Sequence, residues 1–137
     1  MNARSLRVGW LTDVHLNFLS PAGRAAFYQR LRGERMDAIL LGGDIGEARS
    51  VNGLLAEMEA ALEIPIYFVL GNHDFYGGSI RAVRERVAEQ CAASKRLHWL
   101  PAAGTIALTD DTALIGHDSW ADGRAGDYDR SVLQNLC

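Results

Sequence analysis

The chain has 137 residues, which suits one domain, and its composition of 48% hydrophobic and 23% charged residues is ordinary for a soluble globular protein. The formal net charge is -3 and no basic block stands out, which argues against a general nucleic-acid binder. No apolar run approaches the roughly 20 residues needed to cross a bilayer, and the amino-terminus lacks the apolar core of a signal peptide.

Two cysteines are present, Cys91 and Cys137. Cys91 falls within a helical pattern, where it is expected to be a core residue, and neither cysteine has the neighbours of a zinc knuckle or a redox pair. We therefore expect two reduced thiols, a cytoplasmic location and a single domain over residues 1–137.

The first part of the chain predicts a strand, a helix and a second strand. Residues 6–11 form a short, largely apolar segment that is typical of a strand. Ser20 then caps a helix that has Pro21 at its first position and stops at Gly33. The second strand is predicted at residues 37–41, where an apolar run ends in a pair of glycines.

The middle of the chain continues this alternation. A helix is predicted over residues 50–62, and a strand over 65–69, whose continuous apolarity is typical of burial on both faces. Another helix follows residues 77–79. The expected inner stripes are Val51, Leu54, Leu55, Met58 and Leu62 in the first of these helices and Ile80, Val83, Val87 and Cys91 in the second.

This alternation predicts a parallel sheet with crossover helices, so the fold class is α/β. The pattern then changes, because the apolar runs 105–108 and 112–115 are joined by two aspartates and predict an antiparallel hairpin. Residues 118–129 are polar and are predicted to form a loop, and residues 131–136 are predicted to begin a further helix.

Polar side chains of metal-ligand type follow each of the three predicted parallel strands. Ligands of an open α/β sheet bind at the carboxyl ends of the strands, so we expect these side chains to converge. They are Asp13 and His15 after the first strand, Asp44 after the second, and Asn72, His73 and Asp74 after the third.

These residue types indicate a metal centre. Asp13 and His15 point the same way if the backbone between them is extended, and they then bind one cation through an oxygen and a nitrogen. Asp44 has two carboxylate oxygens and can bridge to a second cation, while Asn72 offers an amide oxygen. Mixed imidazole and carboxylate ligation suits zinc, iron or manganese better than calcium.

A pair of such ions would clamp a phosphate and polarise a bridging water into a nucleophile. His73 would lie beside the metals, where it either stabilises the charge on the phosphoryl oxygens or protonates the leaving group. Asp74 would hold that imidazole in orientation and keep it basic. The sequence thus predicts His73 and Asp74 as catalytic residues beside two divalent or trivalent ions, of which the chain retains one or both.

The motifs Asp-x-His at 13–15, Gly-Asp at 43–44 and Gly-Asn-His-Asp at 71–74 resemble, in this order and spacing, those of the calcineurin-like metallophosphoesterases. The resemblance implies a dinuclear centre that hydrolyses phosphomonoesters or phosphodiesters. It also implies that Asp13 and His15 hold one metal and that Asn72 holds the other. By the same match Asp44 bridges the metals, and His73 is the phosphate-side acid with Asp74 as its partner.

The resemblance implies half of an αββα sandwich, in which parallel strands and crossover helices are followed by an antiparallel hairpin. The carboxy-terminal histidine motifs of the family are absent. Gly-His-Asp-Ser at 116–119 resembles the last of them, Gly-His-x-His, but Ser119 replaces the final histidine. His117 is therefore either a ligand or a loop residue, and His98 is expected to be a structural residue near a strand.

Two kinds of function remain open. The first is a phosphohydrolase acting on a phosphate ester, with Phe75, Tyr76 and Trp120 either lining a pocket for an aromatic base or packing structurally. The second is a non-catalytic fragment or binding module of the same fold. A nucleotide-binding α/β domain is disfavoured because no glycine-rich loop follows the first strand. Half of a sandwich exposes apolar surface, so self-association or a completing chain is expected, with no membrane partner.

Overall fold

The computed structural model describes residues 5–119, which form a four-stranded parallel sheet and a small antiparallel pair. The parallel strands lie side by side in chain order. Three of them confirm the predicted strands, and the fourth, around His98, was not predicted as a strand. Their bounds are Val8–Leu11 (β1), Ala38–Leu41 (β2), Ile66–Phe68 (β3) and Leu97–Trp99 (β4).

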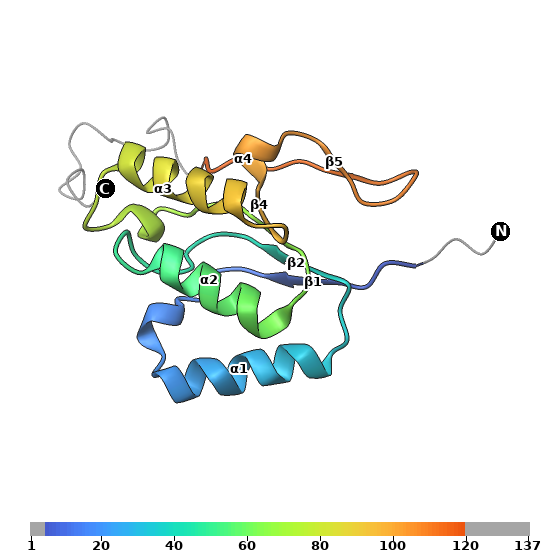
Figure 1. The fold of residues 1–137 in the computed structure, drawn as a ribbon, viewed down its shortest axis with the longest axis horizontal. Coiled ribbons are helices and arrows are strands. Elements are labelled where there is room, and N and C mark those ends of the chain that lie inside the picture. Colours follow the sequence, from blue (N-terminus) through green and yellow to red (C-terminus); the bar gives the residue numbers. More distant parts are fainter. Residues whose placement is uncertain (1–4, 120–137) are drawn as a thin grey trace, which may run out of the picture.

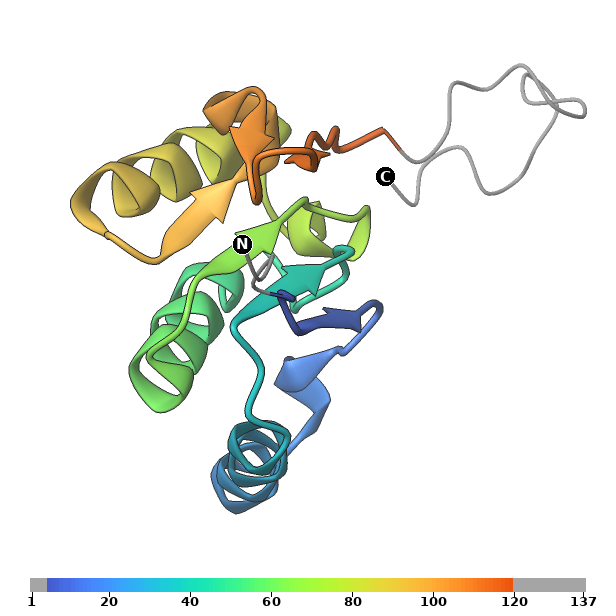
Figure 2. The same cartoon turned by 90° about the vertical axis from the view of Figure 1, so that its right-hand side faces the viewer.

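Three helices follow the first three parallel strands, as predicted, and the third of them leads to the unpredicted strand β4. They are α1 (Pro21–Gly33), α2 (Val51–Leu62) and α3 (Ile80–Ala93). Figures 1 and 2 show all three on the same side of the sheet. The reason is that strands in chain order, joined by crossovers of one hand, return every helix to the same face.

Serine side chains fix the starts of two helices. Ser20 Oγ accepts a hydrogen bond of 3.1 Å from the Gly23 N–H, so the predicted cap of α1 is confirmed. Ser79 Oγ accepts an equivalent bond of 3.1 Å from the Ala82 N–H at the start of α3. Both helix starts are therefore decided by residues next to them in the chain.

The core lies between the helices and the sheet. All five residues of the predicted α2 stripe are buried, and so are Val83 and Val87 of α3. Cys91 is half-buried against the core, and its burial raises the pKa of the thiol. Ile80 is 52% exposed, so its prediction as an inner residue is wrong. It is the first residue of α3 and precedes the turns that pack on the sheet.

Within residues 5–119, no helix packs on the other, open face of the sheet. Trp10, Leu40, Tyr67 and His98 are in register across the four strands on this face. Trp10 is 79% exposed and the other three are half-buried. Parallel sheets are normally covered on both faces, so the prediction that the third strand is buried on both sides is wrong for Tyr67.

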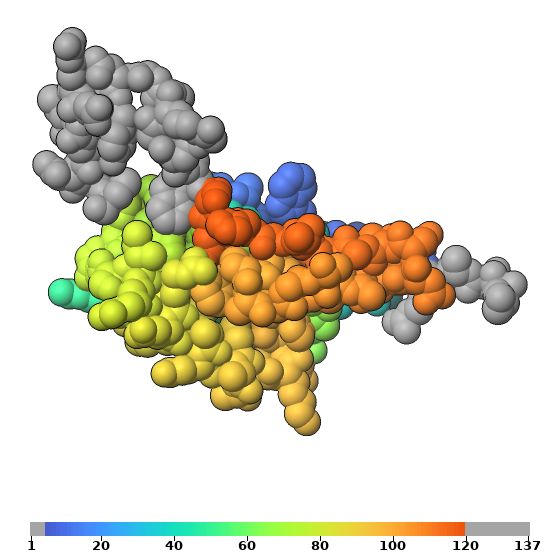
Figure 3. Space-filling model, turned by 90° about the horizontal axis from the view of Figure 1, so that it is seen from above, coloured from blue at the N-terminus to red at the C-terminus, as the bar shows by residue number. Residues whose placement is uncertain are grey.

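The predicted hairpin is confirmed as β5 (Ile106–Ala107) paired antiparallel with β6 (Ala113–Leu114). It follows the short helix α4 (Leu100–Ala103) and projects along one side of the molecule (Figures 1 and 3). The predicted loop beyond residue 119, the helix at 131–136 and Cys137 lie outside the described residues. Within residues 5–119, no helix is long and apolar enough to span a membrane.

Candidate metal centre

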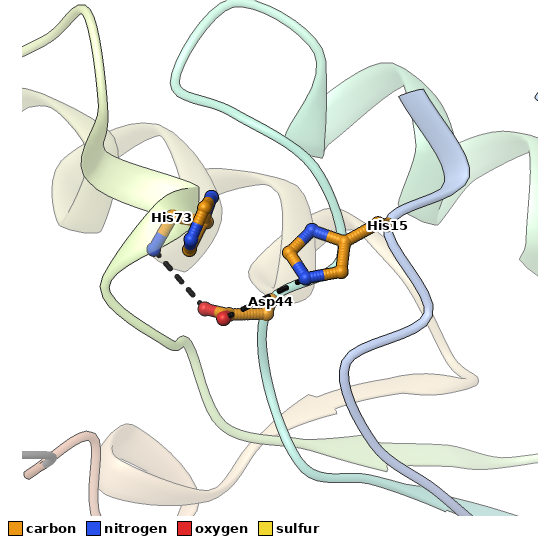
Figure 4. Close-up of side chains that lie close together, drawn as sticks. All are labelled: His15, Asp44 and His73. Carbon is orange, nitrogen blue, oxygen red and sulfur yellow. Dashed lines mark hydrogen bonds and ion pairs between the residues drawn. The ribbon is translucent and has the colours of Figure 1, made fainter. Parts of the chain in front are cut away.

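The loops that follow β1, β2 and β3 meet at the carboxyl end of the sheet. Each contributes one residue to a cluster of His15, Asp44 and His73, whose potential ligand atoms lie within 4.8 Å of one another (Figure 4). The residues are far apart in the chain, so only the folded protein assembles the cluster. Two imidazole nitrogens with a carboxylate oxygen form a donor set that suits a transition-metal ion.

Asp44 is the central residue of the cluster and is 9% exposed. Its Oδ2 lies 3.9 Å from His15 Nε2, while its Oδ1 accepts a hydrogen bond of 3.0 Å from the backbone N–H of His73. The hydrogen bond fixes the plane of the carboxylate and leaves Oδ2 facing the His15 imidazole. A cation shared by these two residues would therefore meet ligands that are already oriented.

Close backbone contacts join the three loops. The N–H of Asp13 donates to the Gly43 carbonyl at 3.1 Å, and the N–H of His15 donates to the Asp44 carbonyl at 2.9 Å. The third loop approaches so closely that a Cβ at Gly71 would lie 2.0 Å from Asp44 Oδ1. Glycine at 71 is therefore required by the contact between the loops, and not by a turn conformation.

The backbone of the candidate ligands is strained. Asp13, His15 and Asp44 have φ of 53°, 41° and 52°, in the left-handed region that residues with a Cβ rarely adopt. An extended backbone was the condition for Asp13 and His15 to point the same way, and this condition is not met. The bonds to the second loop hold the first loop in this shape, and strain of this kind is typical of functional sites.

Asp74 is completely buried and binds backbone N–H groups of two loops. Burial raises the pKa of this carboxyl group to about 6, although its three hydrogen bonds act in the opposite direction. The bonds come from Ile45 at 2.9 Å and Gly46 at 2.8 Å to Oδ1, and from Gly71 at 2.9 Å to Oδ2. Asp74 thus fastens the second loop to the third, and its role as partner of the His73 imidazole stays a prediction.

Asp13 and Asn72 are the other two predicted ligands, and each is hydrogen-bonded to a hydroxyl group. Asp13 is exposed, and its carboxylate accepts a hydrogen bond from the Thr12 hydroxyl. It does not belong to the cluster of His15 and its two neighbours. Asn72 is half-buried, and its Nδ2 donates a hydrogen bond of 2.7 Å to the Tyr76 hydroxyl. That bond turns the amide oxygen of Asn72 away from the phenol.

The cluster fits a bound metal ion. His15 Nδ1 is buried and has no hydrogen-bond partner among residues 5–119. The other ring nitrogen, Nε2, lies near the Asp44 carboxylate. The same side would face a shared cation. His73 approaches the ring of His15 edge-on, with centroids 4.8 Å apart, and completes the group of donors.

Two other histidines lie away from the cluster. His98 stacks on Tyr67 on the open face of the sheet, with ring centroids 4.9 Å apart. His117 is exposed, and its Nδ1 accepts a hydrogen bond of 3.1 Å from the Ser119 N–H. Neither joins a group of three potential ligands in the described part of the chain. Of the aromatic residues considered earlier, Phe75 is buried in the core and Trp120 lies outside the described residues.

Asp118 supports the site, although its sequence context predicts only a polar loop. It is only 5% exposed. Its Oδ1 accepts hydrogen bonds from the Leu70 N–H at 2.8 Å and from Trp99 Nε1 at 3.0 Å, and its Oδ2 accepts one of 2.6 Å from Arg84. The Leu70 bond lies immediately before the Gly-Asn-His-Asp motif. No local sequence signal distinguishes this aspartate from its exposed neighbours.

The chain was also compared with known proteins. A family model described as calcineurin-like phosphoesterase matches residues 6–135, which is most of the chain. No curated protein and no solved structure matches it significantly.

Proposed function

The chain belongs to the calcineurin-like phosphoesterase family, and we propose that it hydrolyses phosphomonoesters or phosphodiesters with the help of bound metal ions. The observation that carries the proposal is the convergence of His15, Asp44 and His73 from three separate loops. A structural role alone does not account for these residues, because two of them hold strained backbone conformations.

The proposed centre is dinuclear. Asp13 and His15 would hold one metal, Asn72 would hold the other, and Asp44 would bridge them, with manganese, iron or zinc as the ions. When bound, the metals supply an activated water and neutralise charge on the phosphoryl group. The chain supplies the orientation: the His73 N–H holds one oxygen of Asp44, and the strained loop holds His15 next to the other.

His73 is proposed as the phosphate-side acid. Its backbone already orients Asp44, and its ring lies against the ring of His15 at the edge of the cluster. An imidazole in this place can donate a proton to the leaving oxygen of the ester or a hydrogen bond to a phosphoryl oxygen. Asp74 anchors the backbone from which this ring extends, because it binds the N–H groups of both neighbouring loops.

A second candidate function is a binding module that keeps the fold without turnover. The open sheet face favours it, because Trp10 is 79% and Ile115 is 76% exposed and both line the same groove of about 190 Å³. We propose that self-association or a completing chain covers this face. If this assembly hydrolyses phosphate esters, it is the active phosphoesterase. If it binds metal without turnover, it is the binding module.

The test is hydrolysis of bis-p-nitrophenyl phosphate with added Mn²⁺, combined with the metal content of the protein. Asp44→Asn keeps the volume of the side chain and removes its charge, so both metal content and turnover should fall at least tenfold. Asp110→Asn, at an exposed position of the hairpin, is the matched control and should change neither. Turnover that survives Asp44→Asn would refute the two-metal proposal, and bound metal without turnover would support the binding module.

A further inference from the structure

Tyr76 contacts two residues of the proposed centre. Its hydroxyl accepts the 2.7 Å hydrogen bond from Asn72 Nδ2, and its ring centroid lies 4.4 Å from that of His73. We infer that Tyr76 is a positioning residue, which turns the Asn72 amide oxygen toward the metal and fixes the plane of the His73 imidazole. This inference rests on the proposed function, because it concerns residues of the same centre.

The hydroxyl of Tyr76 holds one end of the Asn72 amide, so the other end is presented to the site. A primary amide has two N–H donors on one side and a carbonyl acceptor on the other, and only the oxygen binds a metal. Donation from Nδ2 to the phenol leaves Oδ1 on the opposite side. Without the hydroxyl, the Asn72 side chain would lose a hydrogen bond worth about 1 kcal/mol and would no longer be held in the orientation that presents Oδ1.

The phenol is held in place through its own backbone. The N–H of Tyr76 donates to the His73 carbonyl at 3.0 Å, and its carbonyl accepts a hydrogen bond of 3.1 Å from the Ala48 N–H. Ala48 lies in the loop that follows Asp44, so Tyr76 is fastened to two of the three loops that form the site. The backbone from which the phenol extends is therefore fixed relative to Asn72.

The ring of Tyr76 also restricts His73. The imidazole contacts two rings, that of Tyr76 at 4.4 Å and that of His15 at 4.8 Å between centroids. The planes of His73 and Tyr76 differ by 36°, and the planes of His73 and His15 by 80°. Two ring contacts limit rotation of the imidazole, so removal of one ring should change its orientation.

Two variants separate these effects. Tyr76→Phe removes the hydroxyl and keeps the ring, and Tyr76→Leu removes both. Tyr67→Phe is the matched control, because Tyr67 lies on the open sheet face and stacks on His98. Calorimetric titration with Mn²⁺ reports metal affinity, and the NMR signals of the Asn72 side-chain amide in the metal-free protein report the hydrogen bond. Urea unfolding of each variant checks the fold.

Tyr76→Phe should weaken one of the two Mn²⁺ sites about tenfold, leave the other unchanged, and shift the Asn72 amide signals, whereas Tyr67→Phe should do none of these. At saturating Mn²⁺ the kcat of Tyr76→Phe should recover, and that of Tyr76→Leu should stay at least tenfold lower. If wild-type protein binds Mn²⁺ and Tyr76→Phe binds it equally at both sites, the inference about Tyr76 is wrong and the proposed function stands. If wild-type protein binds none of Mn²⁺, Fe²⁺ and Zn²⁺, both are overturned.

Discussion

Replacement of Asp118 separates the energy of buried hydrogen bonds from that of an ion pair. Asp118→Ala removes the acceptor of two donors, the Leu70 N–H and Trp99 Nε1, and also removes the partner of Arg84. Asp118→Asn keeps an oxygen in the position of Oδ1, so both donors remain paired. The Asn variant therefore loses the bond to Arg84 and little else.

Asp118→Ala and Asp118→Asn should lose different amounts of unfolding free energy. A buried donor without a partner costs about 1–3 kcal/mol, so Asp118→Ala should lose about 3–5 kcal/mol of unfolding free energy. The side chain of Arg84 is 39% exposed and can turn to water, so loss of the ion pair in Asp118→Asn should cost only about 1 kcal/mol. The guanidinium also keeps its contact with the Trp99 ring, 4.6 Å from its centroid.

Urea unfolding followed by far-ultraviolet circular dichroism measures both differences, and Arg84→Gln is the control that removes the ion pair from the other side. Equal losses for Asp118→Ala and Asp118→Asn would show that the ion pair dominates. A loss below 1 kcal/mol for Asp118→Ala would show that water or rearrangement satisfies the two donors. Either result would refute the account of Asp118 as an acceptor of buried N–H groups.

Two further predictions follow from the loop contacts and the open face. Gly71→Ala should lower the unfolding free energy by about 2 kcal/mol and abolish Mn²⁺ binding, because its Cβ would overlap Asp44 Oδ1. Gly53 lies on α2, and a Cβ added there meets no atom within 4 Å, so Gly53→Ala should instead stabilise the protein by about 0.5–1 kcal/mol. Equal effects of Gly71→Ala and Gly53→Ala on the unfolding free energy would contradict the contact argument. Trp10→Lys should reduce self-association in sedimentation velocity without changing the far-ultraviolet spectrum. A wild-type protein that is a monodisperse monomer with two bound metals would contradict the need for a covering partner.

Much of the fold could be predicted because its determinants are local. Ser20 with Pro21 marks the start of α1, and the apolar stripe of α2 has the helical period, so neighbouring residues suffice to place both helices. The family was also predictable, since its motifs are short and keep their order. Ile80 was assigned wrongly because helical period alone does not say where a helix passes beyond the sheet.

The sequence by itself determined which residue types follow each parallel strand, and the rule that strand ends of a parallel sheet meet then predicted that those side chains converge. The tertiary structure decided how they meet. It set the left-handed backbone of Asp13, His15 and Asp44, which depends on bonds between loops.

The tertiary structure alone also buried Asp118 against Leu70. The physical reason is distance along the chain. Asp118 and Leu70 are 48 residues apart, and a local pattern carries no information about which buried donor an aspartate will reach. The residue types thus predicted the chemistry of the site, whereas the contacts that orient those residues exist only in the folded chain.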